Sequence, residues 1–273
     1  MRALRQRILG RRPPGQIMSV LALSLMAAFF AVPIVWAVVE AIGGTAMHWL
    51  LNSVFYSTSG AAIALALSIP AGYGLATHDF VGRRLVLIVT ILVMLIPPNA
   101  IVLPLFLEAH AANLLASPLA EILPYGLYPF GVYLAYLYFN TPRFDKLFQT
   151  ARIDGCSEWQ VFKRIALPLS GPVSALIVFL NFLASWTNFF LPWVMYWSFD
   201  TTGRYPLPLG IALQLDTSKG ASFYGALTQL HTASPPSYIA LLLLVTCAPV
   251  FIVFVFVQRW IGAGQLQSVF GRP

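Results

Sequence analysis

The sequence contains few charged residues. Asp, Glu, Lys and Arg make up 9% of its 273 residues, whereas a soluble domain usually carries about 25%. Hydrophobic residues make up 59%, and the mean hydropathy is +0.78. This composition excludes an ordinary water-soluble protein and predicts a polytopic membrane protein with one transmembrane domain.

Cysteine and the common catalytic motifs are also scarce. The two cysteines, Cys156 and Cys247, lie in a polar segment and in an apolar run, so no disulfide framework is expected. The chain has no Gly-x-x-x-x-Gly-Lys-Ser/Thr phosphate loop, no Gly-x-Ser-x-Gly and no His-Glu-x-x-His. The four histidines are scattered near the ends of apolar runs. We therefore expect no catalytic residue, no metal site and no cofactor bound by this chain.

Long apolar runs are what the sequence has instead. A membrane-spanning helix needs about 20 mostly apolar residues. Six stretches meet this requirement, and they cover residues 17–39, 53–76, 85–107, 122–139, 173–196 and 238–257. The fourth is the shortest and contains Pro124 and Pro129.

The basic residues predict the orientation of these spans. Fourteen of the 16 Lys and Arg residues fall in residues 1–16, in the turn after the second run, in residues 140–171 and after residue 257; Arg204 and Lys219 are the exceptions. With six spans these regions share one side, and the bias of positive charge places that side in the cytoplasm. The basic residues that give the net charge of +7 are therefore expected to face the membrane surface and cytoplasmic partners, and the charge does not indicate binding to nucleic acid. The predicted organisation is a basic arm (1–16), a transmembrane domain (17–260) and a cytoplasmic tail (261–273).

Acidic residues are absent from the centres of the predicted spans. Glu40, Glu108 and Glu121 lie at their outer ends, where we expect them to contact water. Because ion-driven carriers use charged groups inside the membrane, this pattern argues against such a carrier.

The segment 140–171 is the most polar part of the chain. Thr141 and Pro142 have the residue types of a helix N-cap and first turn. The following apolar residues recur at helical spacing and predict one apolar face; they are Phe144, Leu147, Phe148 and Ala151.

A second helix is predicted directly after the first. Gly155 is placed to end the first helix in a left-handed conformation. Ser157 and Gln160 form a capping-box pattern, and Pro168 closes the second helix before the fifth run. Periodicity alone fits either an amphipathic loop on the lipid headgroups or a loop that meets a protein partner.

The order of residues in this segment resembles the EAA loop of type I ABC importer permeases. Gln149-Thr150-Ala151 and Asp154-Gly155-Cys156 stand where that family has Glu-Ala-Ala and Asp-Gly-Ala. Matching residues follow at the family spacing, namely Phe162, Ile165, Leu167, Pro168 and Pro172. The departures are Gln149 for Glu, Thr150 for Ala and Cys156 for Ala.

The resemblance extends over most of the chain and favours the maltose-type carbohydrate branch. The further stretches that resemble this branch are 52–84, "IPPNAIVLPLF" (96–106), "SWTNFFLPWV" (185–194), "PLPLGIA" (206–212) and "VQRWI" (257–261). Two regions depart from the family, because the outer loop between the first two spans is reduced to about residues 42–51 and the tail reads "GQLQSVFGRP".

The resemblance implies an all-α fold of six transmembrane helices with both termini cytoplasmic. It implies a permease subunit of an ATP-driven, binding-protein-dependent importer of a sugar or sugar-like solute, in a bacterial or archaeal cytoplasmic membrane. The implied partners are a second permease subunit, two ATPase subunits that use ATP and Mg, and an extracytoplasmic solute-binding protein. The alternatives are a permease for a polyamine or glycerol phosphate and an ion-driven secondary transporter.

The implied site has two parts. The ATPase would receive the apolar face of the first cytoplasmic helix, and the coupling residues carried over are Phe144, Leu147, Phe148, Gln149, Ala151, Asp154, Gly155, Ile165 and Pro168. Trp186 and Asn188 are the candidates for the solute pathway, although Trp186 suits packing equally well. Pro97, Pro98 and Pro104 suit either a break in the third span or a kink required for packing.

Overall fold

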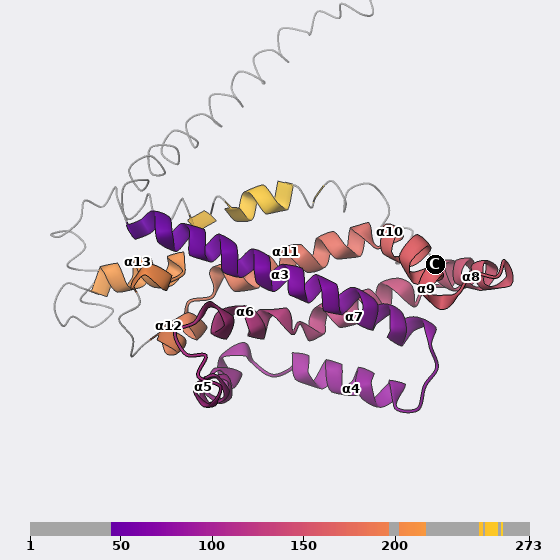
Figure 1. The fold of residues 1–273 in the computed structure, drawn as a ribbon, viewed down its shortest axis with the longest axis horizontal. Coiled ribbons are helices and arrows are strands. Elements are labelled where there is room, and N and C mark those ends of the chain that lie inside the picture. Colours follow the sequence, from indigo (N-terminus) through magenta and orange to yellow (C-terminus); the bar gives the residue numbers. More distant parts are fainter. Residues whose placement is uncertain (1–44, 197–201, 217–245, 248, 256–257, 259–273) are drawn as a thin grey trace, which may run out of the picture.

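The structure, a computed structural model, describes residues 45–196, 202–216, 246–247, 249–255 and 258 (Figure 1). Within these residues it is helical and contains no strand. The predicted basic arm, the first predicted span and the tail lie outside the described residues. Only part of the predicted span 238–257 is described, and it is helical over residues 249–255.

The longest element is α3 (Thr45–Thr77), which contains the whole of the predicted span 53–76. Its 33 residues rise about 50 Å, more than the roughly 30 Å of a bilayer core. The expected loop at residues 42–51 is helical from Thr45 onward, so that part of the prediction is wrong. Trp49 is buried there and packs over Gly210 of α13 (Leu207–Asp216), where a β-carbon would lie 2.2 Å from the indole.

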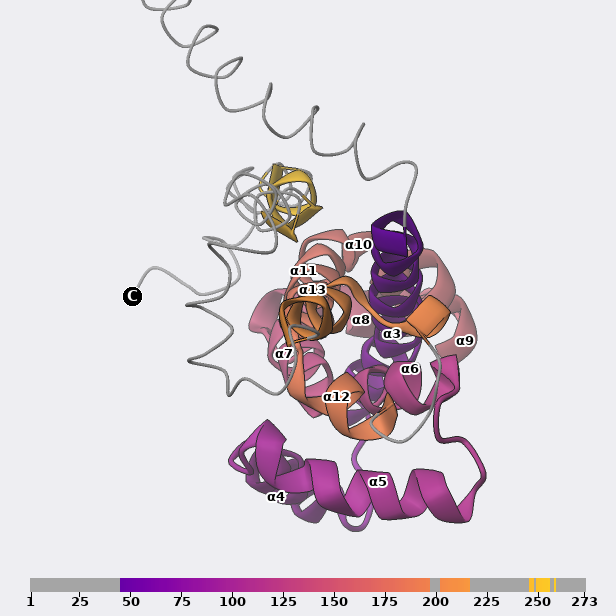
Figure 2. The same ribbon diagram turned by 90° about the vertical axis from the view of Figure 1, so that its left-hand side faces the viewer.

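Small residues allow α3 to approach its neighbours closely. Gly60, Ala64, Ser68 and Gly72 recur every four residues, and all four are buried. Around this stripe pack α6 (Pro118–Gly126), α7 (Pro129–Phe139) and α11 (Gly171–Thr187) (Figure 2). A β-carbon at Gly72 would lie 2.4 Å from Cβ of Ala135 in α7. Such small-residue contacts are typical of helix packing in membranes, where close backbone approach replaces the hydrophobic effect.

The third predicted span is broken. It consists of α4 (Arg83–Met94), η1 (Pro98–Ile101) and α5 (Val102–Ala111), and the halves bend by 99°. Pro97 and Pro98 lie at the bend because neither has an N–H to continue the helix. Of the two alternatives left open for the prolines of this run, a break in the span and a packing kink, the structure shows the break. In Figure 2 α4 and α5 form a layer of their own beneath the other helices.

The fourth and fifth predicted spans are also interrupted. The run 122–139 divides at Leu127 and Tyr128. Leu127 is extended, and Tyr128 is non-helical because Pro129 disfavours helical geometry in the preceding residue. The run 173–196 divides at Asn188, between α11 and α12 (Phe190–Tyr196). In the described part, one helix over Met47–Thr77 meets the length and composition of a span, or up to three spans if each bent pair counts as one.

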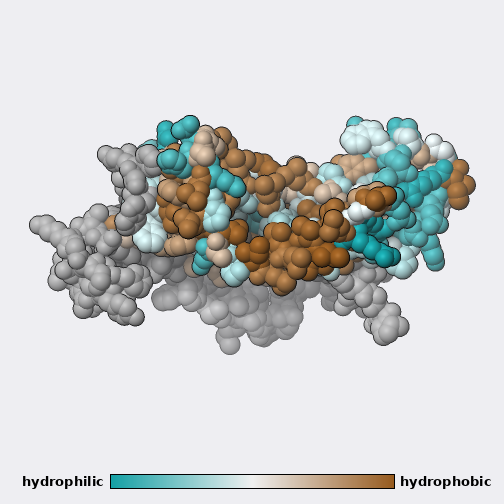
Figure 3. All heavy atoms as spheres, turned by 90° about the horizontal axis from the view of Figure 1, so that it is seen from below, coloured by the Kyte–Doolittle hydropathy of each residue, from teal (hydrophilic) through white to brown (hydrophobic). Residues whose placement is uncertain are grey.

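The surface separates into apolar and polar zones. Figure 3 shows a hydrophobic band over the middle of one face, with hydrophilic residues gathered at the end where the segment 140–171 lies and fewer at the other end. This distribution is the one expected of a protein whose middle lies in lipid and whose ends reach water.

One expectation about acidic residues is wrong. Glu121 does not contact water: it is 2% exposed, and its Oε2 atom has no hydrogen-bond partner within the described residues. It lies in the first turn of α6, where the free amides of the helix N-terminus favour a negative charge. Glu108, by contrast, is exposed as expected.

The packing of α3 on α7 generates the first prediction. Gly72→Ala would place a methyl group 2.7 Å from the backbone nitrogen of Tyr136, so the two helices must separate. Overpacking of this kind costs about 1–3 kcal/mol. We expect a lower melting temperature for the detergent-purified chain. Gly74→Ala is the matched control on the same helix, because a β-carbon there meets nothing within 4 Å; equal melting temperatures for the two variants would contradict the close contact.

Candidate functional site

The polar segment 140–171 forms two helices joined by a sharp turn. The first, α8 (Pro142–Ile153), ends in a Schellman motif: the Cys156 amide donates to the Ala151 carbonyl at 3.0 Å, and the Gly155 amide donates to that of Arg152 at 3.1 Å. Gly155 has φ of +81°, a left-handed conformation that costs little for glycine. The predicted glycine stop is confirmed.

The second helix begins with the predicted capping box. The Gln160 amide donates to Ser157 Oγ, and the Ser157 amide donates to Gln160 Oε1 at 2.9 Å. The helix runs from α9 (Glu158–Val161) through a π-helical turn, η2 (Phe162–Ala166), into α10 (Leu167–Leu169). Pro168 lacks an N–H and would crowd the carbonyl four residues back, so the wider π turn accommodates it. The chain then bends by 68° into α11.

The start of α8 differs from the prediction in one detail. Thr141 stands at the N-cap and Pro142 at the first helical position, as expected, but the Thr141 side chain caps no amide. Its hydroxyl instead donates to the Tyr138 carbonyl at 3.3 Å, which ties the start of α8 to the end of α7.

Aromatic rings attach this pair of helices to α3 and α7. We use the name aromatic cluster for the seven residues Tyr73, Tyr138, Phe139, Phe144, Phe148, Trp159 and Phe162. Tyr73, near the end of α3, has its ring centroid 5.4 Å from Phe148 of α8, 5.6 Å from Phe139 of α7 and 5.1 Å from Phe162 of η2. Phe144 and Phe148 stack at 5.6 Å. Rings at such spacing contribute beyond the area that they bury.

The aromatic cluster corrects the expected role of the apolar face of α8. Phe144, Phe148 and Ala151 are 2%, 1% and 7% exposed, because they pack against α3 and α7 of the same chain. Only Leu147, at 38%, is open to a partner. The apolar face therefore fixes α8 to α3 and α7, and the prediction that this face as a whole is the docking surface is wrong.

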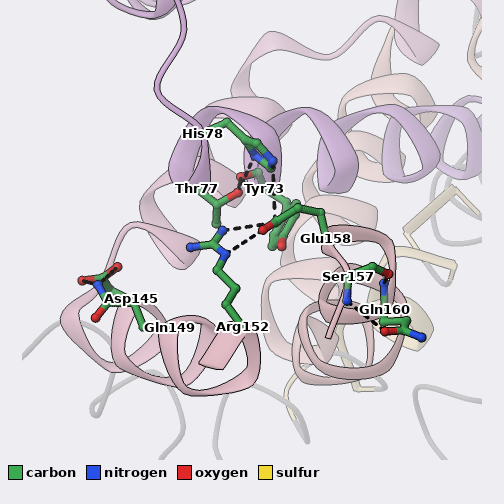
Figure 4. A network of polar contacts seen from close by, with 9 residues as sticks. All are labelled: Tyr73, Thr77, His78, Asp145, Gln149, Arg152, Ser157, Glu158 and Gln160. Carbon is green, nitrogen blue, oxygen red and sulfur yellow. Dashed lines mark hydrogen bonds and ion pairs between the residues drawn. The ribbon is translucent and has the colours of Figure 1, made fainter. Parts of the chain in front are cut away.

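A polar clamp reinforces this attachment (Figure 4). Arg152 of α8 donates to both carboxylate oxygens of Glu158 in α9, at 2.7 and 3.1 Å. His78, just after α3, lies 3.6 Å from the same carboxylate and 2.8 Å from the Thr77 hydroxyl. The clamp therefore joins α8 and α9 to the end of α3.

The clamp is sensitive to acid. The hydrogen bonds from Arg152 lower the pKa of the Glu158 carboxyl from its usual value, and the charge of Arg152 acts in the same direction. Because the folded-state pKa is the lower one, the clamp stabilises the fold above the ordinary carboxyl pKa. This contribution is lost as the pH falls through the folded-state value.

The tip between the two helices presents apolar side chains to the outside. Ile153 is 85% exposed and Trp159 is 67% exposed, on either side of Gly155 in the sequence. Neither residue is among the coupling residues predicted from the sequence. One sign of the exposed tip was present in the sequence: Ile153 is an apolar residue directly before Asp154, and it lies off the helix face that Phe144 and Phe148 define.

The remaining predicted coupling residues lie on or near this exposed side. Gln149, Asp154, Gly155 and Pro168 are exposed, and Ile165 is half-buried. Gln149 donates to both carboxylate oxygens of Asp145 at 3.1 Å. The structure thus divides the nine predicted residues into a buried joint and an exposed surface.

The two predicted pathway residues separate. Trp186 is 1% exposed, stacks on Phe182 at 5.5 Å and donates from Nε1 to the Thr246 carbonyl at 2.8 Å. Each of its groups has a partner inside the chain, which matches the packing alternative. Asn188 is half-buried, and its Oδ1 accepts from the Leu191 amide at 3.0 Å, which caps the start of α12.

Asn188 lines a groove of about 500 Å³ between the layer of α4 and α5 and the helices above it. Tyr125, Tyr128, Pro98 and Pro124 lie on its walls. The helix breaks at Pro97, at Tyr128 and at Asn188 itself all adjoin this groove. Irregular backbone at membrane depth is tolerated where it faces protein or a water-filled cavity, so the groove explains where the breaks occur.

Known proteins resemble the chain over most of its length. The family described as "Binding-protein-dependent transport system inner membrane component" matches residues 68–266. The arabinooligosaccharides transport system permease protein AraQ of Halalkalibacterium halodurans is 34% identical over 79% of this chain and 71% of its own. The diacetylchitobiose uptake system permease protein NgcG of Streptomyces coelicolor is 29% identical over 81% of this chain and 69% of its own.

A solved structure shares the fold. It is the crystal structure of a bacterial ABC transporter involved in the import of the acidic polysaccharide alginate. The likeness has a TM-score of 0.66 at 20% identity and covers 93% of this chain and 97% of that one. The helix-turn-helix of residues 142–169 and these matches agree with the resemblance found in the sequence, and the chain belongs to the family of inner membrane permease components of binding-protein-dependent ABC importers.

Proposed function

We propose that the chain is the transmembrane permease subunit of an ATP-driven importer for an oligosaccharide or a similar sugar. The observation that carries the proposal is the exposed tip of residues 153–159, whose base is fixed to the spanning helix α3 by the aromatic cluster and the clamp. A separate ATPase that moves this tip would move α3 with it. The sugar class rests on the named relatives, which transport arabinooligosaccharides and diacetylchitobiose.

The docking surface for the ATPase is the exposed side of the two helices. Ile153, Trp159 and Leu147 supply exposed apolar area, and Lys146 and Gln149 supply polar groups around it. An aromatic or aliphatic anchor surrounded by polar residues is the usual arrangement of an interface centre. Two ATPase subunits, a second permease subunit and a solute-binding protein complete the proposed assembly.

The solute pathway runs along the groove beside Asn188. An amide and the faces of Tyr125 and Tyr128 are groups that suit hydroxyls and sugar rings. Trp186 supports the wall from behind through its contacts with Phe182 and Thr246.

The turn of the loop generates the second prediction. Gly155→Val would force a β-branched residue into a left-handed conformation, at a cost of about 1–2 kcal/mol or more. We expect a variant that reaches the membrane but loses transport and stimulation of the ATPase. Gly155→Asn is the matched control, because Asn tolerates this conformation and a side chain there meets open space. Transport that is equal in both variants, whether lost or retained, would remove the turn from the mechanism.

The division between joint and surface generates the third prediction. Ile153→Ala combined with Trp159→Ala should strip the ATPase from the purified complex while lowering the melting temperature of the permease only slightly, because both side chains are largely exposed and Trp159 lies at the edge of the aromatic cluster, beside Phe162. Phe148→Ala should lower the melting temperature strongly, since emptying a buried Phe site costs about 3–5 kcal/mol. Leu167→Ala, at another exposed apolar position, controls for general loss of apolar area. Retention of the ATPase by the double variant would show that the tip is not the docking surface.

The orientation generates the fourth prediction. We propose six spans with both termini cytoplasmic, on the basis of the basic residues. In a background with Cys156 and Cys247 replaced by Ser, Arg5→Cys should react with a membrane-impermeant thiol reagent only from the cytoplasmic side. Lys219→Cys should react only from the outside. Labelling of both positions from the same side would contradict the six-span arrangement.

A further inference from the structure

His78 lies at the junction between α3 and the two helices of the polar loop (Figure 4). It follows Thr77, the last residue of α3, and its ring meets that of Tyr73 edge-on, with the ring centroids 6.1 Å apart. Its two ring nitrogens face different partners. Nδ1 lies 2.8 Å from Thr77 Oγ1, and Nε2 lies 3.6 Å from Glu158 Oε2. Since the partner of each nitrogen sets whether that nitrogen carries a proton, these contacts determine the protonation state that suits the site.

The hydroxyl of Thr77 determines which nitrogen carries the proton in the neutral ring. Thr77 Oγ1 donates to the Tyr73 carbonyl, one turn earlier in α3, at 2.8 Å. A hydroxyl has a single proton, and here that proton lies between two oxygens that would otherwise repel each other. Thr77 Oγ1 can therefore only accept a hydrogen bond from His78, which requires a proton on Nδ1. The neutral ring then has a lone pair, and no proton, on Nε2.

This lone pair faces the carboxylate of Glu158. A carboxylate only accepts hydrogen bonds, so an Nε2 atom without a proton makes no bond to α9 across the 3.6 Å contact. A second proton, on Nε2, turns the contact into an ion pair and leaves the bond from Nδ1 to Thr77 intact. Histidine is the side chain whose charge ordinarily changes between about pH 5 and 8. The tie between the end of α3 and α9 therefore depends on this proton.

The charges around the contact favour a tie that forms and breaks. Among the described residues, the titratable groups that act on the Glu158 carboxylate besides His78 are Arg152 of α8 and Tyr73 of α3. Arg152 donates to both of its oxygens and keeps it ionised in mild acid, when His78 gains its charge. Asp79, next to His78, is paired with Arg83. Because the side chains of His78 and Glu158 are 46% and 48% exposed, water screens their attraction and the tie is weak.

We propose that His78 is a positioning residue of the joint, which ties α9 to the end of α3 only when its ring is doubly protonated. The tie itself belongs to this chain alone, and its effect on an ATPase rests on the proposed function. In the proposed transporter, the tip moves α3 through the aromatic cluster and the clamp, and the ion pair of His78 with Glu158 tightens that joint. Mild acid therefore strengthens the joint, until the pH falls far enough to protonate Glu158 as well.

Nitrogen-15 NMR of the full chain, labelled at histidine and purified in detergent, tests the tautomer. The nitrogen shifts distinguish a ring protonated on Nδ1, on Nε2 or on both, and His78→Gln identifies the signals of His78 among those of the four histidines. We expect the Nδ1–H form at about pH 8 and the doubly protonated form on acidification. Thr77→Val removes the acceptor hydroxyl but keeps the shape of the side chain, and it should release His78 to a mixture of tautomers. An Nε2–H ring in the wild type at about pH 8 would overturn the proposal.

Melting temperatures of the full chain test the partner. His78→Gln should lower the melting temperature by about 1–2 °C more at about pH 6 than at about pH 8, because the ion pair exists only at the lower pH. In a Glu158→Gln background, which the aromatic cluster still holds together, the same substitution should act equally at both pH values. A pH dependence that persists in that background, or that is missing in the wild-type background, would show that Glu158 is not the partner.

ATP hydrolysis by the permease assembled with its ATPase in nanodiscs tests the role of the tie. The rate of the wild-type complex is divided by that of the His78→Gln complex, so that the pH dependence of the ATPase itself cancels. We expect this ratio to rise about twofold from about pH 8 to about pH 6, the factor that one exposed ion pair supplies. An equal ratio at both pH values, with the ATPase bound, would show that the tie does not position the joint. A permease that binds no ATPase would instead overturn the proposed function, and the NMR and melting results would still decide whether the tie exists.

Discussion

The close approach of α3 to α7 and α11 is the contact on which the other features of the structure depend. Three helices, α6, α7 and α11, pack closely against α3 along its stripe of small residues, which are Gly60, Ala64, Ser68 and Gly72. Ala135 of α7 is fully buried in this contact. Tyr73 follows this stripe directly, and Thr77 is the last residue of the same helix. The position of α3 therefore determines where the aromatic cluster and the clamp can form.

The aromatic cluster and the clamp resist different movements of the polar loop. The rings of Phe144 and Phe148 bury α8 against Tyr73 and Phe139, and this packing has no strong directional preference. The paired hydrogen bonds between Arg152 and Glu158 are directional and hold the angle between α8 and α9. A force applied at Ile153 or Trp159 therefore reaches α3. The aromatic packing resists separation of α8 from α3, and the Arg152–Glu158 hydrogen bonds resist a change in the angle between α8 and α9. The proposed coupling of an ATPase to α3 needs this stiffness.

Local signals in the sequence predicted local structure, and tertiary packing decided the rest. The glycine stop at Gly155 and the capping box at Ser157 depend on residues within five positions, and both are confirmed. The apolar face of α8 was predicted correctly, but the surface that covers it was not, because α3 and α7 of the same chain bury it. Periodicity shows that Phe148 will be buried, and it cannot show whether its own chain or a partner buries it. Glu121 was misplaced for the same reason, since helices distant in the sequence cover it.

The change from the family's Glu to Gln149 can be explained by its neighbour four residues earlier. Gln149 donates from Nε2 to both carboxylate oxygens of Asp145. A Glu at position 149 would place a second negative charge at the i+4 position, and such like-charge pairs destabilise a helix, whereas a Gln–Asp hydrogen bond stabilises it by about 0.2–0.5 kcal/mol. The amide is thus the better partner in this chain, and the lost charge is compensated within α8. In the proposed assembly, docking of the ATPase then relies less on a carboxylate at position 149 and more on the exposed apolar tip at Ile153 and Trp159.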